Sequence, residues 1–216
     1  MPPSLRSLAF VTFMLHAFPV LAAPNPQVLE DMIVAVANDR APEVRTLLSR
    51  GVDPNTVDAN GDPLLYIAAR AGSAASVDVL LAANANVNAK TRFGDSPLMG
   101  AALEGQLDIV RKLRARGAEI NPAGWTPLIY AATGGHDAVV VFLLDQGARV
   151  NAESPNGTTA LMMAVREGRA STFDLLLQRG AEVQHRNENG VSALDWAKRA
   201  NETAMADKLR RAGARD

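Results

Sequence analysis

The side chains that most often carry out chemistry in proteins are few in this chain and widely scattered. It has 3 histidines and no cysteine, which excludes disulfides, thiolate metal ligands and thiol nucleophiles. His136 follows a pair of glycines, and His185 stands beside Arg186 without a second metal ligand at a recognisable spacing. No serine has a histidine partner at the spacing of a nucleophile and its base. We therefore expect no enzyme activity, no catalytic residue, no cofactor and no metal.

The overall charge points to neither nucleic acid nor membrane lipid as a partner. The chain has 216 residues, 21% of them charged, and a formal net charge of -1. Both nucleic acids and anionic membranes attract proteins through an excess of positive charge, which is absent here. The length and the 48% apolar composition suit one domain of ordinary size.

The pattern that organises the chain is a glycine that returns about every 33 residues. It opens near-copies of one short sequence, and its successive spacings are 33, 30, 33 and 33, at Gly61, Gly94, Gly124, Gly157 and Gly190. Self-similarity at this period indicates a solenoid, in which stacked units contact only their neighbours. Glycines so far apart do not form a phosphate-binding loop. We expect an extended surface that binds a partner.

The fourth unit shows how this period becomes structure. Thr126 and Pro127 are residues that begin a helix, because threonine caps the first turn and proline fits its first position. The glycine pair at 134–135 ends this helix, and a second apolar helix is predicted from about residue 137 to 146. Gly147 follows, where a left-handed residue ends the second helix. An extended finger then leads to the next unit.

These residues resemble the ankyrin repeat. Gly124-Trp125-Thr126-Pro127-Leu128, Gly135-His136 and Val150-Asn151 match most of the family signature. The resemblance implies an all-α ankyrin repeat solenoid of about six helix-turn-helix units with β-turn fingers. It covers residues 23–216, with units at about 26–60, 61–93, 94–123, 124–156, 157–189 and 190–216.

The sequence departs from the family in two ways that affect structure. In the family, a histidine after Thr-Pro-Leu joins a hydrogen-bond network between units, so its absence here predicts a greater dependence on apolar packing. Its place is taken by Tyr66, Met99, Ile129, Met162 and Asp195. The third unit is also three residues short, between Asn121 and Gly124, so we expect a truncated finger and a notch beside Trp125.

Residues 1–22 are predicted to be a secretory signal peptide. Arg6 gives a weakly basic start, an apolar run extends from Leu8 to Phe18, and small residues precede the expected cleavage after Ala22. The alternatives are an uncleaved anchor and a buried first helix. Cleavage predicts a periplasmic or secreted protein with no further membrane contact. Charged residues in the two terminal units favour a monomer, because end units need polar outer faces.

In the ankyrin family, partners bind at the finger tips and at the exposed face of the first helices, which line a concave groove. Exposed aromatic and arginine side chains dominate binding energies, so Phe93, Trp125, Arg92 and Arg166 are predicted to form its centre. The alternative is that the two aromatic rings only cover the bases of fingers. The complete candidate set is Arg70, Arg92, Phe93, Asp95, Leu103, Glu104, Trp125, Thr133, Glu153, Arg166, Glu167 and Arg186.

The expected function is non-catalytic binding of another protein after export. Similarity to exported bacterial ankyrin proteins implies an accessory or stabilising factor of a periplasmic enzyme. The alternative is an inhibitor or immunity-type protein that blocks an envelope hydrolase or a toxin. The repeated framework does not identify the partner, because function depends on the surface residues that vary on it.

Overall fold

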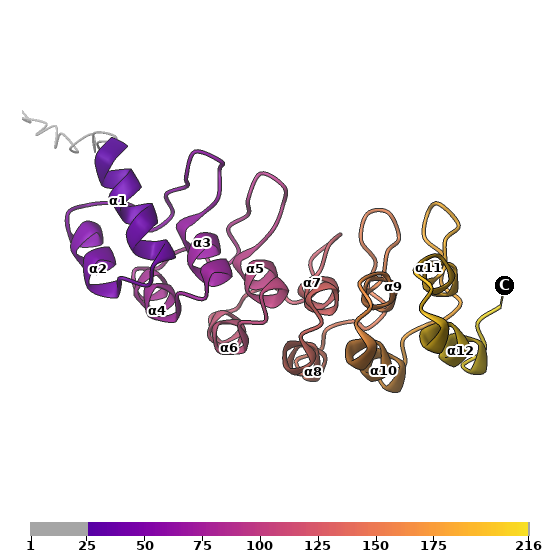
Figure 1. Cartoon of the computed structure of the whole chain (residues 1–216). Helices are drawn as coiled ribbons and strands as arrows, with labels where there is room; N and C mark the ends of the chain where they lie inside the picture. Colours follow the sequence, from indigo (N-terminus) through magenta and orange to yellow (C-terminus); the bar gives the residue numbers. More distant parts are fainter. Residues whose placement is uncertain (1–25, 216) are drawn as a thin grey trace, which may run out of the picture.

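A computed structural model describes residues 26–215, which form six helix pairs stacked side by side in sequence order (Figure 1). The first helices of the pairs make one row, and the second helices make another. The first row consists of α1 (Pro26–Ala37), α3 (Leu64–Ala71), α5 (Pro97–Leu103), α7 (Pro127–Gly134), α9 (Ala160–Arg166) and α11 (Ala193–Arg199). The second row consists of α2 (Ala41–Ser49), α4 (Ala74–Ala82), α6 (Leu107–Ala115), α8 (Asp137–Asp145), α10 (Ala170–Gln178) and α12 (Thr203–Arg211).

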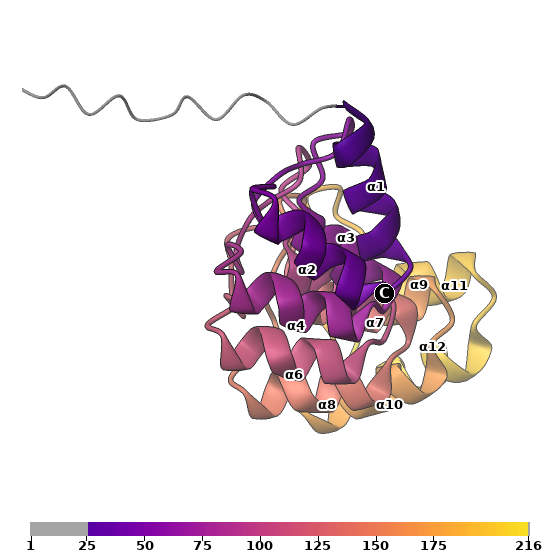
Figure 2. The ribbon, with the colours of Figure 1, turned by 90° about the vertical axis from the view of Figure 1, so that its left-hand side faces the viewer.

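This arrangement confirms the predicted all-α ankyrin solenoid of about six units. Figure 2 shows α4, α6, α8 and α10 of the second row following one another in a layer. In residues 26–215 the only β-pairing consists of isolated bridges within fingers, such as Glu153 with Thr159. The predicted signal peptide, residues 1–22, lies outside the described residues.

Short polar side chains begin most of the first-row helices. The hydroxyl of Thr126 accepts a hydrogen bond from the backbone N–H of Ile129, as its place in the sequence predicted. Ser96, Thr159 and Ser192 cap α5, α9 and α11 in the same way. Each cap satisfies one of the N–H groups that a helix start leaves without a partner. At α3 the corresponding residue is Pro63, which supplies no such bond.

In the second to sixth units, the core repeats one leucine and surrounds it with small residues. This leucine is the first or second residue of the first-row helix and is at most 1% exposed at every position, Leu64, Leu98, Leu128, Leu161 and Leu194. Pairs of buried alanines, such as Ala131 and Ala132, follow it in the same helices. Their small side chains let neighbouring first-row helices approach closely, so each leucine loses its contact with water. Burying such a side chain stabilises the fold by about 1.5–3 kcal/mol.

Polar contacts also join the units, alongside the apolar packing. The residue before a second-row helix forms a hydrogen bond with a backbone carbonyl at the end of the first-row helix of the previous unit. The ring Nε2 of His136 lies 2.8 Å from the Leu103 carbonyl, and Arg169 Nε donates to Thr133 over 3.1 Å. Ser73 makes the equivalent bond to Ala37. These side chains satisfy carbonyl groups that a helix end leaves open.

Five fingers connect each second-row helix to the next first-row helix and project on one side of the stack (Figure 1). We name them in order the first (50–63), second (83–96), third (116–126), fourth (146–159) and fifth (179–192) fingers. The third is three residues shorter than the second, as the glycine spacing predicted.

A substitution at a buried position should destabilise the fold much more than one at an exposed finger position. Leu128→Ala removes a side chain that is 1% exposed, so the free energy of unfolding should fall by about 2–5 kcal/mol. Glu153→Ala changes an exposed finger residue and should cost less than about 0.5 kcal/mol. Urea denaturation followed by circular dichroism measures both, and equal losses would show that the two environments were assigned wrongly.

Asp195 should make the last unit sensitive to acid. Its carboxylate accepts hydrogen bonds from the Ser192 backbone N–H at 2.9 Å and from Arg186 at 2.9 Å. The Ser192 N–H is the main cause that lowers the pKa of Asp195. A carboxyl group with a lowered pKa in the folded state stabilises that state above its unfolded pKa and loses this contribution as pH falls.

Asp195→Asn should therefore lower the melting temperature at pH 7. The difference from the wild type should shrink once the pH drops below about 4, where the unfolded carboxyl becomes protonated. Melting curves at pH 7 and pH 3 measure this difference. A difference in melting temperature of the same size at pH 7 and pH 3 would contradict the role given to the charge of Asp195.

Candidate functional site

The predicted groove residues lie in equivalent places along the first row. Arg70 is in α3, Thr133 in α7 and Arg166 in α9, while Glu104 directly follows α5. Arg70 Nε and Glu104 Oε1 are 3.3 Å apart, so this ion pair bridges two consecutive units. Both side chains remain exposed. A surface ion pair of this kind adds little stability, which leaves both groups available to a partner.

The floor beside this ion pair is formed by a tyrosine that the sequence reading treated only as a packing residue. Tyr66 of α3 is 8% exposed, and its ring lies against Gly100 of α5. A Cβ atom at position 100 would come within 3.0 Å of the ring, so only glycine leaves room for it. A glycine inside a predicted helix, 34 residues after the tyrosine, was the signal in the sequence that marked this contact.

A shallow hollow of about 430 Å³ opens here, lined by Asp62, Tyr66, Ile67, Arg70, Ala71 and Glu104. Burial raises the pKa of Tyr66, and nearby Arg70 opposes this effect. Burial, followed by the charge of Asp58, raises the pKa of Asp62. The hydrogen bond to Glu104 raises the pKa of Arg70. The hollow thus presents the neutral hydroxyl of Tyr66 beside the charged guanidinium of Arg70, and both groups can form hydrogen bonds with a partner.

Asp95 and Trp125 are both held by Tyr130 of α7. The Tyr130 hydroxyl donates a short hydrogen bond to Asp95 Oδ1, and the Trp125 ring packs against the Tyr130 ring with centroids 5.9 Å apart. Burial and then this carboxylate raise the pKa of Tyr130, so its hydroxyl stays protonated. Trp125 is half-buried against the core. Asp95 therefore joins two units, whereas Trp125 packs within its own unit, and both residues remain partly accessible.

Phe93 differs from the other apolar candidates, Leu103 and Trp125, because it is exposed and they are half-buried. It is 76% exposed at the tip of the second finger, and the Arg92 guanidinium lies 4.7 Å from the centre of its ring. The same position before the glycine holds an exposed asparagine in the first, fourth and fifth fingers, at Asn60, Asn156 and Asn189. An apolar ring at a tip where the other fingers are polar is a candidate contact for a partner.

The other candidates contribute less free surface. Leu103 and Thr133 are half-buried, and the Thr133 hydroxyl donates to the Ile129 carbonyl. Glu153 lies 3.7 Å from His185, and Arg186 is bound to Asp195. Glu153 thus joins the fourth finger to the fifth, and Arg186 joins the fifth finger to α11.

Arg166 contacts an aromatic ring that is not among the predicted groove residues. Its guanidinium lies 5.6 Å from the centre of the Trp196 ring in α11, and it pairs with Glu167 at 2.8 Å. Arg92, by contrast, lies over Phe93 of its own finger. The predicted centre thus contains one contact between an arginine and a ring, Arg92 with Phe93, and its second arginine contacts Trp196.

Comparison with known proteins identifies the architecture. Residues 32–123 and 118–187 match the family model of ankyrin repeats in three copies. The chain belongs to the ankyrin repeat family. The crystal structure of the human ASB11 ankyrin repeat domain is similar to it, with a TM-score of 0.78 and 28% identity over 85% of this chain and 84% of that one.

Among curated ankyrin relatives, the putative ankyrin repeat protein YahD of Escherichia coli K12 is 29% identical over 160 residues, which are 55% of this chain and 80% of that protein. Glycerophosphocholine phosphodiesterase GDE1 of Candida albicans is 30% identical over 130 residues, which are 58% of this chain and 10% of the enzyme. The chain thus spans about a tenth of the length of the phosphodiesterase. Ankyrin repeats are generally non-catalytic scaffolds for protein binding.

Two further properties of the ankyrin stack concern sites of other kinds. Among residues 26–215, no three His, Cys, Asp or Glu side chains gather as ligands of a metal ion would. Within the same range, no helix has both the length and the apolar character needed to cross a membrane.

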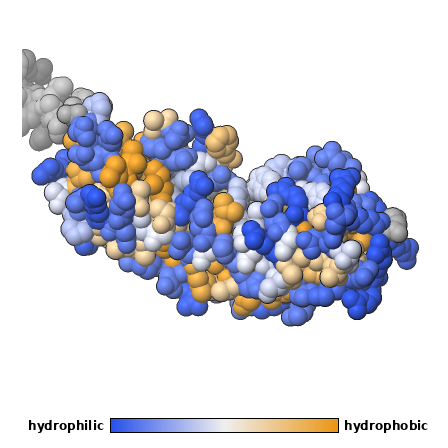
Figure 3. Space-filling model, in the orientation of Figure 1, coloured by the Kyte–Doolittle hydropathy of each residue, from blue (hydrophilic) through white to orange (hydrophobic). Residues whose placement is uncertain are grey.

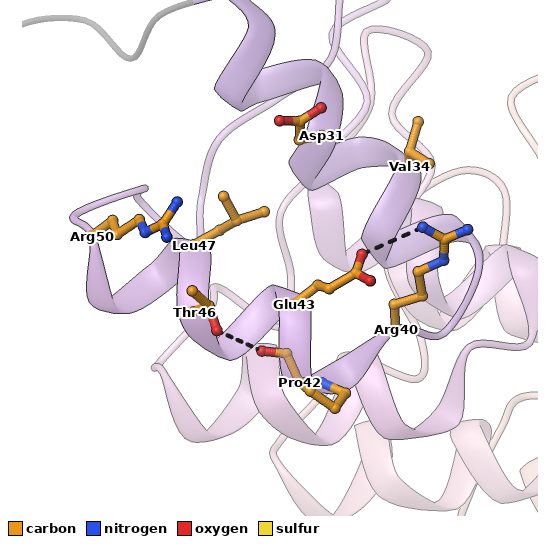
Figure 4. A pocket seen from close by; sticks show the side chains of 8 residues that line it. All are labelled: Asp31, Val34, Arg40, Pro42, Glu43, Thr46, Leu47 and Arg50. Atoms are coloured by element: carbon orange, nitrogen blue, oxygen red, sulfur yellow. Dashed lines mark hydrogen bonds and ion pairs between the residues drawn. The ribbon is translucent and has the colours of Figure 1, made fainter.

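A separate hollow of about 370 Å³ lies between α1 and α2, where an ion pair joins Arg40 to Glu43 at 3.4 Å (Figure 4). Val34 at its rim is 43% exposed. Its lining comes from the first ankyrin unit alone, so it is apart from the candidate surface on α3 to α11.

The two finger aromatics should differ in their importance for stability. Phe93→Asn introduces the residue that other fingers carry at this position, so the free energy of unfolding should change by less than about 0.5 kcal/mol. Trp125→Ala removes a half-buried ring and should cost about 1–3 kcal/mol, less than a fully buried aromatic. Chemical denaturation measures both values, and an equal loss in the two variants would contradict the exposure assigned to Phe93.

Proposed function

We propose that this chain is an exported, non-catalytic ankyrin protein that binds a partner protein and serves as an accessory or stabilising factor of a periplasmic enzyme. The observation that carries the binding role is Phe93, whose ring is 76% exposed and lies beside Arg92 at a finger tip. A large ring exposed in this way gives the isolated fold little stability. Aromatic and arginine side chains are the commonest centres of binding energy.

The shape of the surface supports docking over a broad area. The exposed groups along the first row belong to consecutive helices, from Arg70 in α3 to Arg166 in α9. They carry both signs of charge, and Arg70 and Glu104 line a shallow hollow beside Tyr66. A partner that contacts several units gains binding energy from each of them, which suits a stable accessory complex.

Export is supported by the sequence of residues 1–22, with its basic start, apolar run and small residues before position 23. Expression of the full chain in a bacterium, followed by N-terminal sequencing of the periplasmic fraction, tests this part. The proposal requires a mature chain that begins at Ala23.

Binding should depend on Phe93 without any change in folding. We expect Phe93→Asn to weaken the complex with the natural partner by about 2 kcal/mol. The partner is first captured from a periplasmic extract with the wild-type protein and identified, and titration calorimetry then compares the variants. Asn189→Ala, at the same position of the fifth finger, is the matched control and should retain wild-type affinity.

Unchanged affinity of the Phe93→Asn protein would remove the central contact from the proposal. Activity of the captured enzyme, measured with and without this protein, then separates the two roles. An accessory factor preserves or raises that activity, whereas an inhibitor or immunity-type protein abolishes it.

A further inference from the structure

The shortened third finger leaves a gap at the tips of the fingers while their bases remain joined. Asn88 accepts a hydrogen bond from the Glu119 N–H at 2.8 Å, and Asn121 accepts one from the Arg149 N–H at 2.9 Å. The same asparagine contact joins the other finger bases, for example Asn151 to Glu182. The missing residues are therefore those of one finger tip. Figure 3 shows the corresponding dip in the upper edge of the molecule.

The fourth and fifth fingers show what fills this position elsewhere. The Glu188 N–H donates to the Asn156 carbonyl at 3.1 Å, and the His185 ring lies 2.7 Å from the Gly157 carbonyl. A Cβ atom at Gly157 would come within 3.1 Å of Asn187. The fourth and fifth fingers thus pack tip against tip, and the fifth finger binds two carbonyl groups of the fourth.

The second finger has the same turn, but the finger that follows it in the stack lacks a full tip. The N–H of Gly94 closes this turn on the Thr91 carbonyl at 2.9 Å, as Gly157 does on Ser154 at 2.8 Å. Phe93 and Gly94 therefore occupy the positions of Asn156 and Gly157. A Cβ atom at Gly94 would meet no other atom within 4 Å. Because Asn156 and Gly157 direct their carbonyl groups toward the next finger, we infer that the carbonyl groups of Phe93 and Gly94 face the gap and can accept further hydrogen bonds.

The fourth finger, on the other side of the gap, has no backbone N–H group at the equivalent position. Pro155 stands at the position of Glu188 and has no N–H group to donate. A Cβ atom at Gly124 would lie 3.4 Å from its ring, so Pro155 covers the base of the third finger. On this side of the gap, the position of the donating Glu188 N–H therefore has no donor.

We propose that a reverse-turn loop of the partner protein fills this gap. Its backbone N–H groups bind the carbonyls of Phe93 and Gly94, as the fifth finger binds the fourth, and an apolar side chain packs between Phe93 and Trp125. A turn is the occupant that fits because the space left is that of one finger tip. Addition of a backbone segment to unpaired backbone groups is an established mode of recognition. This inference rests on the proposed protein-binding function.

A peptide copy of the fifth finger tests the gap directly. The probe is residues 183–192 of this chain, closed into a ring by a disulfide between added terminal cysteines. Titration of the isotope-labelled mature chain should shift the amide signals of Phe93 and Gly94 and the indole signal of Trp125, in a saturable way. Phe93→Asn should weaken this binding at least about tenfold.

The decisive variant fills the gap while keeping Trp125. Residues 119–123 are replaced by a copy of residues 149–156, which restores the full length of the third finger. Because the other units have this length, the variant should fold, and its circular dichroism and melting curve verify this. It should lose the peptide shifts at Phe93 and Gly94.

Three results would overturn the inference. The first is equal binding of the peptide to the gap-filled variant, and the second is a set of shifts confined to Gly190 at the open side of the last finger. The third is a concentration-dependent shift of Phe93 without peptide, because this would make a second copy of the chain the occupant.

Experiments with the natural partner distinguish a failure of this inference from a failure of the proposed function. If that partner binds the gap-filled variant as tightly as the wild type but releases Phe93→Asn, the gap inference fails and protein binding stands. If the peptide binds the gap as described but no periplasmic protein is captured, the loop-binding chemistry stands and the proposed accessory function fails.

Discussion

The rest of this structure depends on the close packing of first-row helices through one buried leucine per unit. Leu98 and Leu128 are at most 1% exposed, and the alanines beside them allow neighbouring helices to approach. Since each unit contacts only the adjacent ones, this single contact is reproduced along the chain. It fixes the spacing of the fingers and of the exposed side chains between them. The binding surface is thus an indirect product of the core.

Because the core fixes the framework, the exposed positions are free to carry other chemistry. Tyr66 occupies the place of a family histidine, and Gly100 in the next unit makes room for its ring. The polar links between units are supplied instead by residues such as His136 and Arg169, which bind helix-end carbonyls. The surface next to Tyr66 can therefore vary without loss of the stack.

The sequence was sufficient to predict the helix pairs and the truncated finger, since these depend on local signals. Thr126 caps α7 as predicted, because a hydroxyl before a proline needs only its own turn to act. The partners of Trp125 and Arg166 were not predictable in this way. Their rings and charges meet Tyr130 and Trp196, and the second of these lies in another unit. Such contacts depend on rotamers and on the distance between helices, which the repeat pattern does not contain.

The shortened unit also shows which contacts between units do not depend on a finger tip. Ion pairs connect several consecutive second-row helices, such as Asp78 with Lys112 and Asp174 with Lys208. The junction of α6 with α8 has Arg111 over the Phe142 ring, at 5.7 Å from its centre. Across the same junction, Tyr130 still binds Asp95 and His136 still binds the Leu103 carbonyl. A finger can therefore be shortened while the helix stack remains continuous, so the outline of the finger edge can vary independently of the core.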